Sequence, residues 1–378
     1  GHFASVIAAT VGVISGILWL AAILFSFGVV FETLTGQPAA LGLIGGTIVI
    51  AIYTMFGGLK AVAATDIFQM IFIAIGVFIL FFVVLDNTDG WVTVIKQLPK
   101  HAFDFTPQGE TITDKLEYFQ VWLSSGLAAI TSISVVQRAM ASKSEHVAQN
   151  AFYIAGVIYL LFGMFPIMLG YIASITMPGI EDPNAIIPLL AIEHLHPILV
   201  AIFVGAVISA IMSTSDSILL GIGTLCSVDL LPRIIRNPSE KLRLIVARWS
   251  IPFIALLALW KAFNTSSVIG GIGEAVAVGF AGISGPFLLV IWWKRLSPMG
   301  GYAGIAAGFI SFMASAALLP NIPSSLVAFV VSIAISIIVS LTTQRFNAPK
   351  PLTDNENVPM DSSNRLGTLP LVGKTRLD

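Results

Sequence analysis

Most of the chain alternates between long apolar windows and short polar segments. A window of about 20 apolar residues is long enough to cross the hydrocarbon core of a membrane as a helix. Ten such windows run approximately over residues 4–31, 41–56, 67–85, 119–137, 151–175, 198–228, 244–263, 268–293, 300–319 and 324–343. Gly57-Gly58 shortens the second window, and Arg248 interrupts the seventh. The pattern predicts an all-α polytopic membrane protein with ten spans in one transmembrane domain, residues 1–345.

The composition agrees with a membrane protein. Of the 378 residues, 56% are hydrophobic and 10% are charged, whereas roughly 25% are charged in an ordinary soluble domain. The net charge of −1 argues against a nucleic-acid partner, which would need a concentrated basic face. Residues 346–378 are rich in Pro, Asn, Asp and Ser and have no hydrophobic period, so we expect them to form a disordered tail.

Lysine and arginine residues predict the orientation, because short cytoplasmic loops carry an excess of them. With residue 1 on the cytoplasmic side, ten of these residues lie in inner loops and four in outer loops. The inner ones are Lys60, Arg138, Lys143, Arg233, Arg236, Lys241, Arg243, Arg248, Lys294 and Arg295, and the outer ones are Lys96, Lys100, Lys115 and Lys261. An even number of spans then places both ends, including the tail, in the cytoplasm.

A group of hydroxyls and one carboxylate interrupts the apolar window 198–228. A carboxylate inside a membrane costs about 2.5–3.5 kcal/mol on insertion scales, so Asp216 is expected to face protein or water. Ser213, Thr214 and Ser217 are spaced three and four apart and therefore share one helix face. Their oxygens are of the class that hard cations prefer. The alternative is that these hydroxyls only bond to their own or a neighbouring helix.

Two further polar segments lie at predicted inner ends of spans. Gly57-Gly58 permits a tight turn, and Thr65 or Asp66 is positioned to cap the helix that follows. The fourth window ends in a segment where Arg138 and Lys143 have the spacing of headgroup anchors.

These segments together resemble one family. The motifs that carry the resemblance are Gly-Gly-x-x-Ala-Val-x-x-Thr-Asp-x-x-Gln at 57–69, Gln-Arg-x-x-Ala-x-Lys-Ser at 137–144, Ala210 with Ser213 and Thr214, and Gly285-Pro286 through Trp292-Trp293-Lys294-Arg295 with Gly300 and Gly304 beyond. The chain resembles the sodium/solute symporters, a family that includes the bacterial proline permease and the sodium/glucose, choline, pantothenate and iodide carriers. The resemblance runs in register from Gly1 to about Phe346.

The resemblance implies an inverted-repeat, five-plus-five transporter fold in the plasma membrane, the inner membrane of a bacterium, with a solute site near mid-membrane beside broken helices. By this similarity the chain lacks about the first three helices of the family. One of these is the broken helix that supplies the rest of the sodium site. We therefore expect a longer parent protein to transport and the chain beginning at Gly1 not to transport alone.

The resemblance also assigns roles to residues. Ala210 offers a backbone carbonyl, and Ser213 and Thr214 their hydroxyls, to a sodium ion. Asp66 matches a family aspartate on the route of the ion to the cytoplasm. For Asp216 two roles stay open: it adds charge to the ion path, or it caps a break in the helix.

The solute site is less defined. Positions that touch solute in relatives fall near Ser125, Ala128 and Ala129, whose small side chains predict a roomy, weakly polar pocket. Glu274 stands beside several glycines that let a helix bend, and it is placed to meet a solute ammonium. The alternative is that Glu274 pairs with Lys261.

The function expected from the sequence is sodium-coupled symport of a small organic solute, an amino acid, carboxylate or quaternary amine, by alternating access. Proton coupling through Asp216, or a transporter-like sensor or scaffold, are the alternatives. No constellation of His, Cys and acidic residues has catalytic spacing, so an enzyme is not expected, nor is a cofactor or a metal other than Na+. The expected partners are the solute, Na+ and the lipid bilayer, and the sequence predicts no particular oligomeric state.

Overall fold

The computed structural model describes residues 2–107, 109–319 and 321–350, and these residues form helices without a strand. The elements are α1 (His2–Thr35), α2 (Ala39–Asp86), α3 (Trp91–Gln97), η1 (Lys100–Phe103), α4 (Ile112–Thr131), α5 (Ile133–Met140), α6 (Glu145–Thr176), η2 (Pro183–Ala185), α7 (Ile186–His194), α8 (Pro197–Thr224), η3 (Leu225–Leu230), α9 (Leu231–Ile234), α10 (Glu240–Ala262), α11 (Val268–Gly279), η4 (Phe280–Ser284), α12 (Gly285–Trp292), α13 (Pro298–Leu318) and α14 (Ser324–Thr343). Most of the predicted tail, residues 351–378, lies outside the described residues.

Nine helical segments of the described chain are long and apolar enough to cross a membrane. They are Ser5–Thr35, Ala39–Asp86, Ile112–Met140, Glu145–Thr176, Pro197–Ile234, Glu240–Ala262, Val268–Trp292, Pro298–Leu318 and Ser324–Thr343. The all-α membrane fold is therefore confirmed. The count is nine because the predicted second and third spans both fall within α2.

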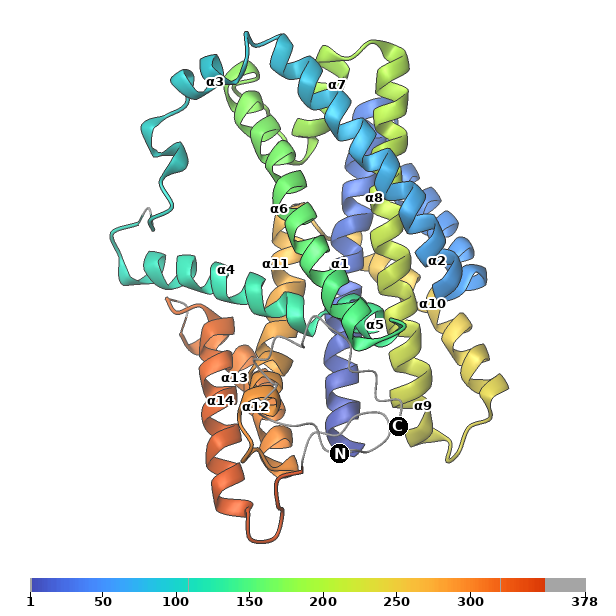
Figure 1. The fold of residues 1–378 in the computed structure, drawn as a ribbon, viewed down its shortest axis with the longest axis vertical. Coiled ribbons are helices and arrows are strands. Elements are labelled where there is room, and N and C mark those ends of the chain that lie inside the picture. Colours follow the sequence, from blue (N-terminus) through green and yellow to red (C-terminus); the bar gives the residue numbers. More distant parts are fainter. Residues whose placement is uncertain (1, 108, 320, 351–378) are drawn as a thin grey trace. The chain divides into compact units, whose positions relative to one another are not determined.

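Helix α2 consists of two arms that fold back on each other at Gly58. A straight helix of its 48 residues would be roughly 70 Å long, far more than the roughly 30 Å of a hydrocarbon core. Gly58 has φ 67° and ψ 173°, a non-helical conformation open essentially to glycine alone. The Tyr53 hydroxyl and Thr65 Oγ1 lie 2.5 Å apart, although 12 residues in a straight helix span roughly 18 Å. The arms are the blue helices beside the α2 label (Figure 1).

The predicted helix cap at Thr65 or Asp66 is wrong. The second arm of α2 resumes directly after Gly58, so Thr65 and Asp66 lie well inside it. The Thr65 hydroxyl instead bonds within the helix, 3.1 Å from the Ala61 carbonyl oxygen and 3.0 Å from that of Val62. Because glycine alone makes the turn, neither residue is needed to begin the helix.

Two compact units make up the chain, and each is built from segments distant in sequence. The first unit comprises Gly1–Ser15, Pro107–Phe152 and Val276–Asp378, and the second comprises Gly16–Thr106 and Tyr153–Ala275. The predicted transmembrane domain 1–345 extends over both. Helices α2, α8 and α10 belong to the second unit, and α4, α13 and α14 belong to the first.

In the first unit, α13 and α14 pack closely through small residues. Gly300 and Gly304 face Ser340 and Ser336 across the interface, and the Ser332 hydroxyl donates a 2.8 Å hydrogen bond to the Gly304 carbonyl oxygen. Small residues allow the backbones of membrane helices to approach closely. This packing accounts for two glycines of the fourth motif.

In the second unit, α2 packs along α8, and Gly76 lets the second arm approach Ala206 closely. Beside this contact the second arm, α3, α6, α7 and α8 share an apolar core. Its buried members include Leu80, Phe81, Val84, Val94, Leu98, Leu169, Ile172, Leu190 and Phe203. The core holds α2 against α8, and this pairing positions the polar residues of both helices.

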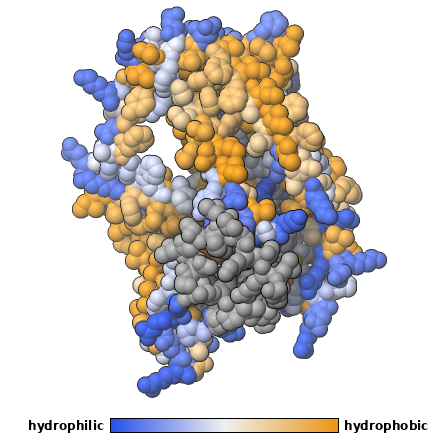
Figure 2. All heavy atoms as spheres, viewed as in Figure 1, coloured by the Kyte–Doolittle hydropathy of each residue, from blue (hydrophilic) through white to orange (hydrophobic). Residues whose placement is uncertain are grey.

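Apolar side chains are also exposed over long stretches. Helix α6 presents Tyr153, Ile154, Val157 and Leu160 outward, and Figure 2 shows apolar residues covering much of the face over α6 and the second arm of α2. A helix that is apolar on all sides is typical of a lipid environment or a buried position.

Candidate ion and solute site

The polar cluster of α8 lies in regular helix. Pro197 occupies the first turn, where its missing N–H is not needed, and the helix then continues without a break to Thr224. Asp216 is therefore not at a helix break, which excludes capping, one of the two roles left open for it. The irregular part begins later, in the π-helix η3.

Ser213 and Asp66 meet although they are 147 residues apart in the sequence. The Ser213 hydroxyl donates a hydrogen bond to Asp66 Oδ1 at 2.5 Å, and both side chains are half-buried. The contact joins α8 to the second arm of α2. Two motifs that are distant in the sequence thus supply a carboxylate and a hydroxyl to one place.

Thr214 and Ala210 also lie together. The exposed Thr214 side chain donates from Oγ1 to the Ala210 carbonyl oxygen at 3.0 Å. This is the bond within the helix that was considered as an alternative to ion binding. A hydroxyl that donates keeps its lone pairs, and a carbonyl oxygen has two. Both oxygens therefore retain the capacity to bind a cation.

A chain of oxygen atoms continues along α8 from Ser213 to Asp216. The Ser217 hydroxyl lies 2.9 Å from the Ser213 carbonyl oxygen and 3.3 Å from Asp216 Oδ1. Asp216 is fully buried, as expected for a carboxylate on a membrane-spanning helix. Together Asp66, Ser213, Ser217 and Asp216 place two carboxylates at the ends of one short polar path.

The residues near which solute contacts were expected lie on α4, in the first unit. Ser125 and Ala129 are exposed, and Ala128 is half-buried. The expected continuous fourth span, 119–137, is interrupted, because Ser132 adopts an extended conformation (φ −62°, ψ 129°) between α4 and α5. The surface formed by the three residues ends one turn before this break.

Glu274 is paired with Lys261. The Glu274 Oε2 atom lies 2.8 Å from Lys261 Nζ, and 54% of the Glu274 side chain is exposed. The glycines beside Glu274 lie in regular helix α11, and irregular geometry begins only at Phe280. The ion pair that was the alternative to a solute contact is therefore present.

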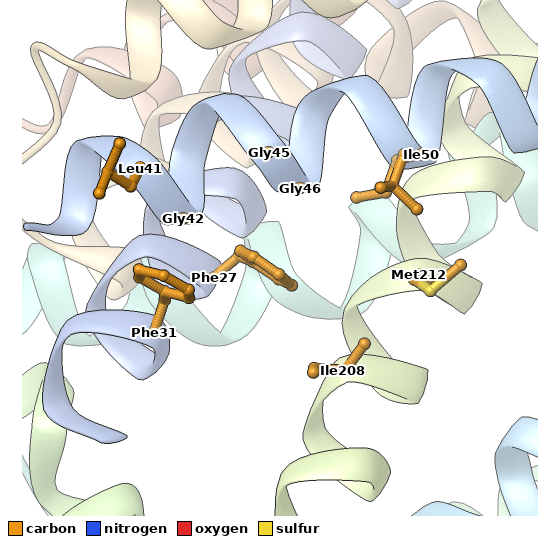
Figure 3. Close-up of a pocket in the computed structure, with 10 residues that line it drawn as sticks. Phe27, Phe31, Leu41, Gly42, Gly45, Gly46, Ile50, Ile208 and Met212 are labelled. Atoms are coloured by element: carbon orange, nitrogen blue, oxygen red, sulfur yellow. The ribbon is translucent and has the colours of Figure 1, made fainter. Parts of the chain in front are cut away.

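An apolar pocket of about 300 Å3 lies between α1, the first arm of α2 and α8, where the sequence predicted no site. Phe27 and Phe31 of α1 form one side of it, and Ile208 and Met212 of α8 form another (Figure 3). Gly42 and Gly46 pack directly on Phe31 and Phe27, respectively. The G-x-x-x-G spacing at 42–46 was the available sequence signal, because it is typical of closely packed membrane helices.

Comparison with known proteins gives one family. The family described as "Sodium:solute symporter family" matches residues 2–308. Among curated proteins, the chain is 29% identical over 297 residues to sodium/proline symporter 2 of Staphylococcus saprophyticus, covering 75% of this chain and 57% of that protein. It is 26% identical over 334 residues to the high-affinity proline transporter PutP of Bacillus subtilis, covering 84% and 69%. The chain thus spans little more than half the length of the first of these relatives.

A solved structure has the same fold. It is the substrate-bound, outward-open state of a Na+-coupled sialic acid symporter, described as revealing a novel Na+ site. The TM-score is 0.72 at 17% identity, covering 89% of this chain and 74% of that chain. At this identity the likeness concerns the fold alone.

Proposed function

The chain belongs to the sodium:solute symporter family, and from this premise we propose that it forms the greater part of a carrier that couples the entry of Na+ to the uptake of a small organic solute. The family membership confirms the resemblance found in the sequence. The family consists of symporters rather than enzymes, as the sequence led us to expect.

The observation that carries the proposal is the hydrogen bond between Ser213 and Asp66. We assign Ala210, Ser213 and Thr214 as sodium ligands and Asp66 and Asp216 as carboxylates of the ion path. A cation that enters between the Ser213 and Asp66 oxygens is stabilised by the carboxylate charge and by hard oxygen donors. The hydrogen bond between Ser213 and Asp66 then breaks when the ion binds. Ion binding is thereby linked to the packing of α8 against α2.

The coupling of Na+ to the solute follows from thermodynamic linkage between their binding equilibria. Inward movement of Na+ along a negative membrane potential supplies roughly 2.3 kcal/mol per charge per 100 mV. Each ligand shifts the carrier between outward-open and inward-open states only through its different affinity for the two. The resulting coupling free energy is reciprocal, so that Na+ raises solute affinity as much as solute raises Na+ affinity.

For the solute we propose an amino acid, a carboxylate or a quaternary amine, and the proline transporters among the relatives favour an amino acid. Ser125, Ala128 and Ala129 form the proposed solute surface. Glu274 is a further candidate for solute binding only if it exchanges the Lys261 ammonium for that of a solute.

Proton coupling is the second candidate, and the complete burial of Asp216 is the observation that favours it. A buried carboxylate is a suitable proton carrier. Localisation in the plasma membrane, with the C-terminus in the cytoplasm, is proposed from the lysine and arginine bias of the loops.

Two experiments test the proposal. Binding of radiolabelled Na+ to the purified full-length protein, with K+ as the control, examines the α8 oxygens directly. Uptake of proline, a carboxylate and choline into vesicles that carry the full-length protein, under a Na+ gradient or a pH gradient, examines coupling. Saturable Na+ binding and Na+-driven uptake support the proposal. Uptake driven by the pH gradient alone would reject sodium coupling.

A further inference from the structure

A second pocket, of about 140 Å3, lies within the second unit at the break in α2. The first arm of α2, with Gly57 and Gly58, forms one wall, and α8 and α10 form the others. A single water needs only about 10–15 Å3 of such space, so the pocket is large enough for a polyatomic group. It is separate from the residues proposed for Na+ and solute.

Thr54 is one of the residues that line this pocket. It is fully buried, and its Oγ1 has no hydrogen-bond partner among the residues that the structure describes. A threonine in a helix normally bonds to a carbonyl three or four residues earlier. Thr47, on the same arm, does so to Leu43 at 2.6 Å, and Thr224, across the pocket, does so to Leu220 at 2.9 Å. The Thr54 hydroxyl is therefore left for another acceptor or donor.

Arg248 brings a positive charge to the same pocket. It is an exposed residue of α10, within an apolar segment long enough to span a membrane. Within the part of the chain that the structure describes, Arg248 has neither a hydrogen bond nor an ion pair, whereas Lys261 on the same helix pairs with Glu274. A cationic side chain in a membrane span normally pairs or marks a site.

We propose that this pocket binds the phosphate group of an anionic phospholipid. The Arg248 guanidinium matches two phosphate oxygens, and the Thr54 hydroxyl donates to a third. Gly57 and Gly58 keep the wall at the break free of side chains, and Leu220 and Ile251 offer apolar contact to the glycerol and the upper acyl chain. Basic pockets between membrane helices bind lipid headgroups in this way. The bound lipid stabilises the break of α2 against α8 and α10.

The test measures thermal unfolding of the purified chain in micelles of an uncharged, phosphate-free maltoside detergent with added phosphatidylglycerol. A second arm replaces phosphatidylglycerol by inorganic phosphate. Arg248→Gln removes the charge, and Arg243→Gln is its matched control because Arg243 is likewise an exposed arginine of α10 but does not line the pocket. Thr54→Val removes the free hydroxyl, and Thr47→Val removes one that is already bonded. The melting temperature in the detergent alone reports whether each variant folds.

We expect phosphatidylglycerol to stabilise the unsubstituted chain and both controls. Its apparent affinity falls about tenfold or more for Arg248→Gln and about two- to tenfold for Thr54→Val. If inorganic phosphate protects the unsubstituted chain as well as phosphatidylglycerol does, and Arg248→Gln loses both effects, the pocket binds free phosphate and the lipid proposal is overturned. The proposal is overturned if Arg248→Gln and Arg243→Gln respond alike to both additives.

Discussion

The Ser213 hydroxyl donates a 2.5 Å hydrogen bond to the Asp66 carboxylate, and this contact joins α8 to the second arm of α2 across 147 residues of sequence. The pair places a charge of the right sign beside oxygen atoms of the right type for an alkali cation.

Replacement of Ser213 tests the role of this contact. Ser213→Ala removes one of the proposed sodium ligands, so the apparent sodium constant should rise about tenfold for each 1.4 kcal/mol of lost ligand contact. The double variant Ser213→Ala/Thr214→Ala should lose the dependence of uptake on Na+. Ser215→Ala is the matched control, because the buried Ser215 hydroxyl has no hydrogen-bond partner within the described part of the chain. If uptake by the double variant still depends on Na+, the two hydroxyls contribute only to the packing of the helices.

Asp216→Asn distinguishes the two coupling ions. If Na+ is the coupling ion, uptake by the variant depends less on the Na+ gradient, because a negative charge is lost from the ion path. Uptake then stays insensitive to a pH gradient. Uptake in vesicles under each gradient is the measurement. If a pH gradient alone drives uptake and Asp216→Asn abolishes it, the buried carboxylate is a proton carrier.

The ion pair between Lys261 and Glu274 predicts that substitution of either residue has the same small effect on the free energy of unfolding. An exposed ion pair contributes about 0–1 kcal/mol, so Glu274→Gln and Lys261→Gln should each lower the free energy of unfolding by no more than that. The apparent solute constant should stay the same in both. A rise in that constant for Glu274→Gln but not for Lys261→Gln would identify Glu274 as a solute contact.

Gly58→Ala should destabilise the second unit. Its positive φ and extended ψ are strained for any side chain, at a cost of about 1–3 kcal/mol. Gly57→Ala is the control, because an added methyl there meets only Ala61 Cβ at 3.6 Å. Thermal unfolding in detergent compares the two, and equal melting temperatures would mean that Gly58 does not need its conformation.

Gly304→Val should separate α13 from α14 in the first unit. An added side chain at Gly304 meets the Ser336 hydroxyl and lies 2.9 Å from the Ser332 carbonyl oxygen. Overpacking of this kind costs about 1–3 kcal/mol. Gly301→Ala, with nothing within 4 Å, should be neutral or slightly stabilising. Equal unfolding free energies for the two variants would contradict close packing at this interface.

The sequence by itself determined the class of the protein and most of its helices. A backbone in lipid must satisfy its own hydrogen bonds, so apolar windows of this length become helices whatever their neighbours are. The motifs also identified the α8 hydroxyls and Asp66 before any contact was known. The two arms of α2 followed from the Gly57-Gly58 pair, although the structure moved the start of the second arm ahead of Thr65.

Only the tertiary structure decided which polar groups meet. A membrane helix is apolar on faces toward lipid and toward protein alike, so the hydrophobic pattern carries little information about which face contacts which helix. Packing between separate helices brings Ser213 to Asp66 and Lys261 to Glu274. The sequence also does not separate Thr54 from Thr47: both are threonines of one helix arm, and only the structure shows that Thr47 bonds within the helix while Thr54, in the described part of the chain, does not.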